Sequence, residues 1–266
     1  MPAPEDIDLP LDRYMFDEFE SHELMVLLRN GTLACMEKYG HADTYIPEPA
    51  PPPVSKHNER RYGITDGRLA KRLGFRADQG DAAPREKEKP LTADEEFTIT
   101  GGSSKPGEPG KGGRNEAGKD VPPGGCKGQA LKALGYSPTA TPGNPAMVQN
   151  LDLESFDASL RTDSVKQALR DWSACMRDKG YTYDAEPFSA SNDRRFATPA
   201  ATEAEKEVAM ADVECKNSSR LIEIWKAEET RIQKSLTARN RQELEKVAKQ
   251  RDTTLSLIKE LSGTSS

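Results

Sequence analysis

Four cysteines are the residues best placed to do chemistry in this sequence: Cys35, Cys126, Cys175 and Cys215. None of them lies in a C-x-x-C spacing, and no histidine stands at a metal-ligand spacing from any of them. A catalytic thiol needs a histidine beside it, and His41 alone does not provide one. We therefore expect no metal, no cofactor and no thiol catalysis.

The cysteines permit three disulfide connectivities. The order Cys-Met, Gly, Cys-Lys occurs twice along the chain, which favours pairing within each copy, Cys35 with Cys126 and Cys175 with Cys215. Such bridges form in oxidising compartments, and in the chain-entropy description each stabilises the fold by roughly 3–5 kcal/mol. The alternative is a cytosolic protein with four reduced, buried cysteines.

Helical patterns surround the cysteines. Apolar residues recur with a period near 3.6 from about Tyr14 to Tyr39, and again from Asp163 to Cys175. Gly40 and Gly180 follow these patterns and can take the positive φ with which many helices end. A shorter helix is expected to begin at Gly125.

The longest helical pattern starts at Thr202, whose hydroxyl and the carboxylate of Glu205 have the capping-box spacing. No proline or glycine interrupts it before residue 262, so one continuous helix would be about 90 Å long. It either folds back near Thr237 to Gln242 or projects from the protein. Its apolar stripe gives candidate partner-binding residues: Ile232, Leu236, Leu244, Val247, Leu255 and Ile258.

Between these helices the sequence is rich in proline and glycine. Five prolines within residues 47–53 favour polyproline II, and residues 78–125 look like a flexible insert. Within the insert, Phe97 to Thr100 alone has strand character. The glycines and lysines of residues 101–125 lack the order and the preceding strand of a phosphate-binding loop.

These patterns predict a mainly α-helical fold of two disulfide-stapled helical units with little β structure and long irregular loops. The expected divisions are an N-terminal unit over 1–137, a linker over 138–162 and a C-terminal unit over 163–266. The long helix of 202–262 is either continuous or a helical hairpin. With 35% hydrophobic and 31% charged residues, the chain has few residues that can form a hydrophobic core. The disulfides are therefore expected to be important for stability.

Composition excludes several classes of function. A net charge of −6 argues against a nucleic-acid partner, because a protein that binds nucleic acid is expected to carry a basic patch. No run of 18 apolar residues is present, and the first residues have no signal-peptide pattern. Hydrolase, zinc-protease and dinucleotide-binding motifs are absent from the sequence, and its acidic pairs are typical of solvated helix faces. We therefore expect a protein that is not an enzyme.

Three aromatic residues provide a second hypothesis, namely a small-ligand or cell-wall glycan site formed by Trp172, Tyr181 and Tyr183. Trp172 belongs to an apolar stripe and also fits a purely structural role in the core. The two tyrosines follow Gly180, and both packing and stacking on a sugar remain open for them.

Five stretches of the sequence resemble a family of actinobacterial secreted proteins and lipoproteins, of the Streptomyces type, whose function is not established. They are Asp8 to Tyr14, Cys35-Met36 to Gly40, Gly124 to Gly128, Trp172 to Tyr181 and Ala211 to Lys216. The resemblance implies export, as a secreted or lipid-anchored protein whose leader is absent from this sequence. It also implies an accessory role beside transporters and their adaptor proteins.

The leading functional hypothesis is thus a non-enzymatic, extracytoplasmic protein of the cell envelope. Its long helix would bind a protein partner, such as an adaptor or permease of an ABC-type export system. Association with the membrane would be peripheral or through a lipid anchor.

Overall fold

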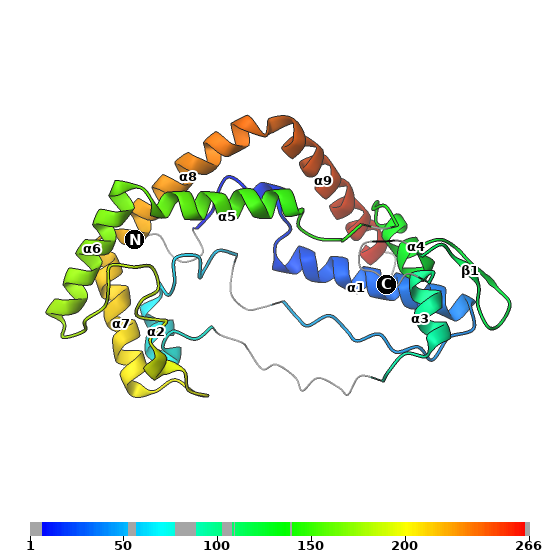
Figure 1. The fold of residues 1–266 in the computed structure, drawn as a ribbon, viewed down its shortest axis with the longest axis horizontal. Coiled ribbons are helices and arrows are strands. Elements are labelled where there is room, and N and C mark those ends of the chain that lie inside the picture. Colours follow the sequence, from blue (N-terminus) through cyan, green and yellow to red (C-terminus); the bar gives the residue numbers. More distant parts are fainter. Residues whose placement is uncertain are drawn as a thin grey trace. The chain divides into compact units, whose positions relative to one another are not determined.

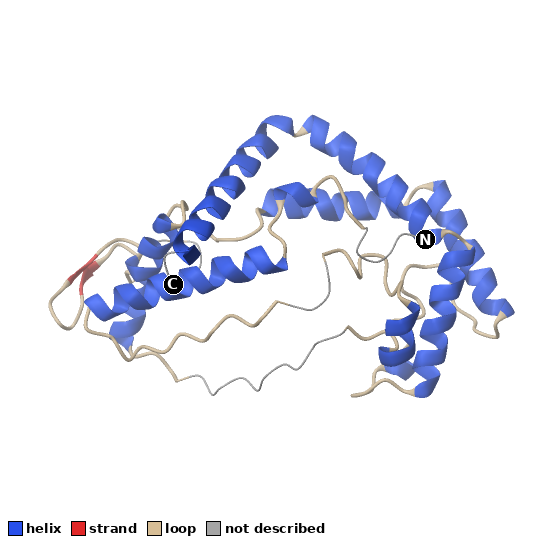
Figure 2. Ribbon diagram, turned by 180° about the vertical axis from the view of Figure 1, so that it is seen from behind, coloured by secondary structure: helices blue, strands red, loops and turns tan. Residues whose placement is uncertain are grey.

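The computed structural model in Figure 1 describes residues 7–52, 57–77, 89–102, 108, 110–138 and 140–263. Helices dominate this part of the chain, and a short hairpin supplies its β structure (Figure 2). The predicted mainly α-helical fold is therefore confirmed. No helix in the described residues is both long enough and apolar enough to cross a membrane.

The chain folds into two compact units, and each is assembled from separate stretches of sequence. Unit 1 contains Met1–Arg13, Pro53–Ala82 and Ala146–Leu244. Unit 2 contains Tyr14–Pro52, Ala83–Pro145 and Glu245–Ser266. This arrangement differs from the predicted division into two consecutive units joined by a linker.

Unit 1 is a helical assembly around two tryptophans. Its helices are α2 (Gly67–Leu73), α5 (Ala146–Leu160), α6 (Asp163–Asp178), α7 (Glu203–Ser218) and α8 (Leu221–Arg239), with the 3-10 helix η3 (Arg194–Phe196). Helix α8 packs on both α5 and α6, and α7 packs on α2 and α6. Trp172 of α6 and Trp225 of α8 are 3% and 1% exposed, so both are core residues.

Unit 2 combines α1 (Glu18–Lys38), α3 (Ala93–Thr100) and α4 (Gly125–Ala133) with the antiparallel strands β1 (Gly113–Arg114) and β2 (Asp120–Val121). The last helix, α9 (Arg241–Gly263), starts in unit 1 and continues in unit 2. Leu24 and Leu28 of α1, Leu131 of α4 and Ile258 of α9 share one buried cluster. Helix α9 thereby completes the core of unit 2.

Each unit contains one disulfide. Cys35 of α1 is bonded to Cys126 of α4 in unit 2, with a Cα–Cα distance of 5.4 Å. Cys175 of α6 is bonded to Cys215 of α7 in unit 1, at 5.5 Å. The predicted pairing is confirmed. Since disulfides persist in oxidising surroundings, this pattern supports an extracytoplasmic compartment.

The two predicted glycine stops are confirmed as Schellman motifs. After α1, Gly40 at φ 96° donates its N–H to the carbonyl of Glu37, and the N–H of His41 reaches the carbonyl of Met36. After α6, Gly180 at φ 88° and Tyr181 repeat this arrangement. The repeated Cys-Met-x₃-Gly pattern therefore encodes a bridged helix end.

The predicted long helix is divided into α7, α8 and α9. The first break lies at Arg220, which takes the left-handed φ of 53° after Ser218 and Ser219 both hydrogen-bond the carbonyl of Cys215. The second break lies at Asn240, within the predicted 237–242 window, where its side chain caps the carbonyl of Leu236. Polar side chains that bond to the backbone thus end helices without proline or glycine.

Three further expectations differ from the structure. The expected linker of residues 138–162 contains helix α5, whose buried serines and leucine face the core of unit 1. The expected insert of 78–125 contains α3 and the β1–β2 hairpin, although residues 78–88, 103–107 and 109 lie outside the described part. Phe97 to Thr100 are helical because a Thr92–Glu95 capping box starts α3 and Gly101 ends it.

Candidate ligand-binding site

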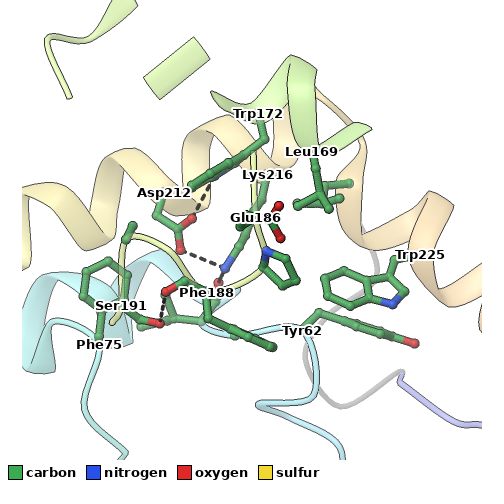
Figure 3. A pocket seen from close by; sticks show the side chains of 15 residues that line it. Tyr62, Phe75, Leu169, Trp172, Glu186, Phe188, Ser191, Asp212, Lys216 and Trp225 are labelled. Atoms are coloured by element: carbon green, nitrogen blue, oxygen red, sulfur yellow. Dashed lines mark hydrogen bonds and ion pairs between the residues drawn. The ribbon is translucent and has the colours of Figure 1, made fainter. Parts of the chain in front are cut away.

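A small, partly open cavity lies in unit 1, between α6, α7, α8 and neighbouring loops (Figure 3). The space open to the centre of a water molecule is about 20 Å³. A cavity needs about 10–15 Å³ by this measure to hold one water. The cavity therefore accepts one small polar group. Its lining includes five aromatic side chains: Tyr62, Phe75, Trp172, Phe188 and Trp225.

A buried ion pair forms the polar wall of the cavity. Lys216 Nζ donates to Asp212 Oδ2 at 2.7 Å and to the carbonyl of Ile64 at 3.1 Å. The indole Nε1 of Trp172 donates to the other carboxylate oxygen of Asp212 at 2.9 Å. Burial raises the pKa of the Asp212 carboxyl, and the ammonium of Lys216 opposes that shift. The side chains of Asp212 and Lys216 are 3% and 10% exposed.

The spacing of this pair follows from helix geometry. Asp212 and Lys216 are four residues apart, so both side chains lie on one face of α7. Cys215 lies on the neighbouring part of the same buried surface. An ammonium carries three N–H donors, and described residues accept two of those of Lys216. The third is available to a group in the cavity.

Gly63 lets the chain approach this ammonium closely. Its φ is 80°, and a Cβ at this position would lie 2.8 Å from Lys216 Nζ. Any side chain here would therefore displace the lysine or the loop. The carbonyl of the next residue, Ile64, is one of the two acceptors of the ammonium.

The loop that carries Phe188 closes the other side. Phe188 stacks on Phe156 with 6.3 Å between ring centroids and lies 6.2 Å from the ring of Trp225. Its φ of 61° is an unusual conformation for a residue with a bulky side chain, at a cost of about 1–3 kcal/mol. Ser191 holds the loop by donating to the Phe188 carbonyl at 3.0 Å. Aromatic packing thus maintains a strained backbone over the cavity.

Of the three predicted ligand-site residues, the structure brings Trp172 into the cavity lining. Tyr181 and Tyr183 pack against the same hydrophobic core without lining the cavity. The hydroxyl of Tyr183 donates to Asp193 at 3.0 Å, and burial together with this bond raises the pKa of Tyr183 to about 12. The tyrosines therefore have structural contacts.

The predicted site did not include Asp212, Lys216, Gly63 or Phe188. A signal was present for the first two: an acid and a base four residues apart, on either side of a bridged cysteine, must face the same buried surface. No local pattern linked residues 62–64 or 186–191 to them.

A second polar cluster in unit 1 is fully paired. Glu229, which is 0% exposed, accepts hydrogen bonds from Arg61, Tyr62 and Ser155. Arg61 also pairs with Asp152 at 2.9 Å. Burial lowers the pKa of Arg61, but its bonds to the two carboxylates raise it by more. This cluster joins the segment before α2 to α5 and α8, and we assign it a structural role.

The cluster in unit 2 that most resembles a catalytic group lacks the required geometry. His41 Nε2 lies 3.0 Å from an Asp94 carboxylate oxygen and 3.4 Å from the hydroxyl of Thr98. A relay needs the carboxylate and the nucleophile on opposite ring nitrogens. In the described chain, no group of three or more histidine, cysteine or acidic side chains could hold a metal ion.

The predicted partner-binding stripe is largely covered by the chain itself. Leu236, Leu244 and Ile258 are 4%, 0% and 1% exposed. The other three are half-buried: Ile232, Val247 and Leu255. A partner could reach the buried side chains only after a rearrangement of the helices. The apolar stripe therefore no longer supports an interaction through this helix. Binding to a transporter adaptor or permease stays a prediction.

Fold and cavity together define a class, that of a disulfide-bonded, mainly helical protein with a small cavity that has one charged wall. Comparison with known proteins adds no relative: no family model, no curated protein and no solved structure matches the chain. The resemblance to actinobacterial secreted proteins and lipoproteins stays a prediction.

Proposed function

We propose that this protein is a non-enzymatic, extracytoplasmic binding protein of the cell envelope, and that unit 1 binds a neutral, hydroxyl-bearing ligand at Lys216. The observation that carries the proposal is a buried ammonium with one N–H donor left over in an aromatic cavity. A buried donor without an acceptor costs about 1–3 kcal/mol or more, so a group that accepts it binds favourably.

The electrostatics of the cavity favour a neutral ligand over an anion. The charge of Lys216 is offset by Asp212, and Glu186 contributes a second carboxylate to the lining. An anion would therefore gain little net attraction. A hydroxyl or carbonyl oxygen can accept the free N–H, while aromatic faces pack against the apolar side of a sugar ring.

The size of the cavity limits what enters it. In this conformation there is room for one hydroxyl or carbonyl group of a larger ligand, so deeper entry of the ligand requires displacement of the Phe188 loop. Release of the unusual φ of Phe188 lowers the cost of that displacement. Fragments of a cell-wall glycan have this chemistry.

Attachment to the cell surface, as a secreted or lipid-anchored protein, belongs to the same proposal. It is supported by the two disulfides and by the family resemblance of the cysteine motifs. Fractionation of the source cells tests it: the protein is expected in the culture medium or the detergent phase of membranes, and recovery in the cytosol would contradict it.

The ligand proposal is tested by thermal and chemical unfolding in the presence of N-acetylglucosamine oligosaccharides, with acetate as an anionic comparison. A ligand at 100 times its Kd is expected to stabilise the protein by about 2.7 kcal/mol. The variant Lys216→Met alone leaves Asp212 buried and unpaired, which should cost about 3–5 kcal/mol. The test therefore uses Asp212→Leu with Lys216→Met, which removes both charges.

The matched control is Lys206→Met, on the same helix, where the lysine pairs with the exposed Glu203. The oligosaccharides should stabilise the wild type and the control but not the double variant, and acetate should stabilise none of them. Equal stabilisation of the double variant, or none of the wild type by any oligosaccharide, would remove the proposal.

A further inference from the structure

The two disulfides differ in how accessible their sulfurs are. Cys35 is 6% exposed, and Cys126 and Cys215 are 0% exposed. Cys175 is half-buried, and its sulfur accepts a hydrogen bond from Ser218 at the exposed end of α7. A dissolved thiol must reach a sulfur to exchange with it. Of the four cysteines, Cys175 is the most exposed residue and so the one that a dissolved thiol reaches most readily.

Ser218 adds a chemical preference to this accessibility. Its hydroxyl lies 3.4 Å from Cys175 Sγ and 3.2 Å from the carbonyl oxygen of Cys215, and its single proton is shared between these two acceptors. A donor beside a sulfur stabilises the thiolate form, which lowers the barrier to its departure. Neither sulfur of the Cys35–Cys126 bridge has such a donor among the described residues. Exposure therefore directs the first attack to Cys175, and the hydrogen bond from Ser218 favours the later departure of Cys175 from the mixed disulfide.

We propose that Cys175–Cys215 is a thiol–disulfide exchange site for a dithiol reductant of the extracytoplasmic space, and that Cys35–Cys126 is a permanent structural bridge. This inference concerns a covalent modification and does not depend on the ligand proposed for the cavity.

The reaction has two balanced steps. A thiolate of the reductant attacks Cys175 Sγ, forms a mixed disulfide with it and releases Cys215 as a thiolate that takes up a proton. The second thiol of the reductant then attacks the reductant's own sulfur in that mixed disulfide. Cys175 leaves as a thiolate, stabilised by Ser218, and is protonated. Two electrons and two protons pass from the dithiol to the protein disulfide.

The position of the bridge links this exchange to the cavity. Cys175 lies one helical turn after Trp172 on α6, and Cys215 lies between Asp212 and Lys216 on α7. Exchange removes the covalent tie between the two helices that hold the polar wall. The hydrogen bond from Trp172 to Asp212 and the pair of Lys179 with Glu214 remain between them. Trp172 should therefore report the exchange by its fluorescence.

The experiment titrates the folded full-length chain with dithiothreitol, blocks free thiols with iodoacetamide and identifies the blocked cysteines by peptide mass spectrometry. Cys175 and Cys215 should become blocked at a reductant ratio about tenfold or more below that needed for Cys35 and Cys126. Helical circular dichroism should be retained at that point. Simultaneous reduction of both bridges, earlier reduction of Cys35–Cys126, or loss of helix with the first reduction would overturn the proposal.

Two further measurements locate the attack. Glutathione, a monothiol, should be trapped as an adduct on Cys175, and an adduct on Cys215 would contradict the proposed direction. The variant Ser218→Ala should need several-fold more dithiothreitol for the same reduction. The matched control Ser219→Ala removes a hydroxyl that bonds the same Cys215 carbonyl without touching Cys175. Identical behaviour of the two variants would exclude the role of Ser218.

Discussion

Several charged side chains of this protein are buried, where an unpaired charge would be destabilising, and each of them has hydrogen-bond or ion-pair partners. Lys216 and Asp212 neutralise each other in the cavity wall, and Glu229 receives three donors. Continuum arguments show that such pairs seldom add stability over an apolar pair of the same size, although breaking one is expensive. Under the proposed function, the pair in the cavity wall serves recognition of a ligand rather than stability.

A pH dependence belongs to this scale. Glu95 starts α3 by accepting hydrogen bonds from the backbone and hydroxyl of Thr92, and it also accepts one from Thr44 at 2.8 Å. These bonds hold the pKa of Glu95 below its ordinary value. A carboxyl with a lowered folded-state pKa stabilises the fold above its unfolded pKa, and this stabilisation is lost as pH falls.

The variant Glu95→Gln should therefore lose less stability than the wild type between pH 6 and pH 3, as measured by urea unfolding. The matched control Glu96→Gln changes the next residue of α3, whose side chain takes no part in the capping box. An acid response of Glu95→Gln as steep as that of the wild type would contradict the capping role.

At the scale of elements, glycines decide how closely two helices of unit 2 meet. Gly125 begins α4 at φ 61°, and a Cβ there would lie 2.5 Å from the carbonyl oxygens of Thr98 and Ile99 and from the N–H nitrogen of Gly101. The end of α3 is thus in backbone contact with the start of α4. Cys126 follows directly, so this contact also positions the cysteine that bonds to α1.

The variant Gly125→Ala should disturb both the contact and the bridge. Because the clashing atoms are backbone atoms that cannot move aside, we expect a lower yield of oxidised monomer and a loss of stability well above the roughly 1 kcal/mol of φ strain alone. The control Gly118→Ala has a similar φ of 74° with nothing within 4 Å of the added carbon. Non-reducing electrophoresis and urea unfolding distinguish them, and equal losses would refute the contact argument.

At the scale of the whole molecule, two disulfides support a chain with few core formers. The bridge of unit 2 spans 91 residues of sequence and that of unit 1 spans 40. In the chain-entropy description the longer loop removes more freedom from the unfolded chain. Each bridge lies inside its own unit, so each should stabilise that unit.

Paired substitutions test this estimate. Cys35→Ser with Cys126→Ser should lower the free energy of unfolding of unit 2 by roughly 4.6 kcal/mol, and Cys175→Ser with Cys215→Ser that of unit 1 by roughly 3.9 kcal/mol. The measurement is urea unfolding followed by hydrogen exchange of helices α1 and α6. If both pairs of substitutions destabilised the same helices, the bridges would not act within separate units.

Part of this protein could be predicted from its sequence alone. The helices around Cys35 and Cys175, their ends at Gly40 and Gly180, and the pairing of the four cysteines follow from local signals. The periodicity of apolar residues, the glycines at helix ends and the repeated order of the cysteines can all be recognised in the sequence without knowledge of the fold. The helical class and the oxidising surroundings follow from the same signals.

Tertiary structure alone decided the rest. Helix α5 appears where a linker was expected, because its buried face is matched by α8 more than sixty residues later. The stripe of α8 and α9 was expected to await a partner, yet Leu236, Leu244 and Ile258 are buried. The cavity brings residues 62–64, 172, 186–191 and 212–216 together. These contacts depend on which apolar surfaces are buried against one another. That is a property of the folded chain, and no local sequence pattern predicts it.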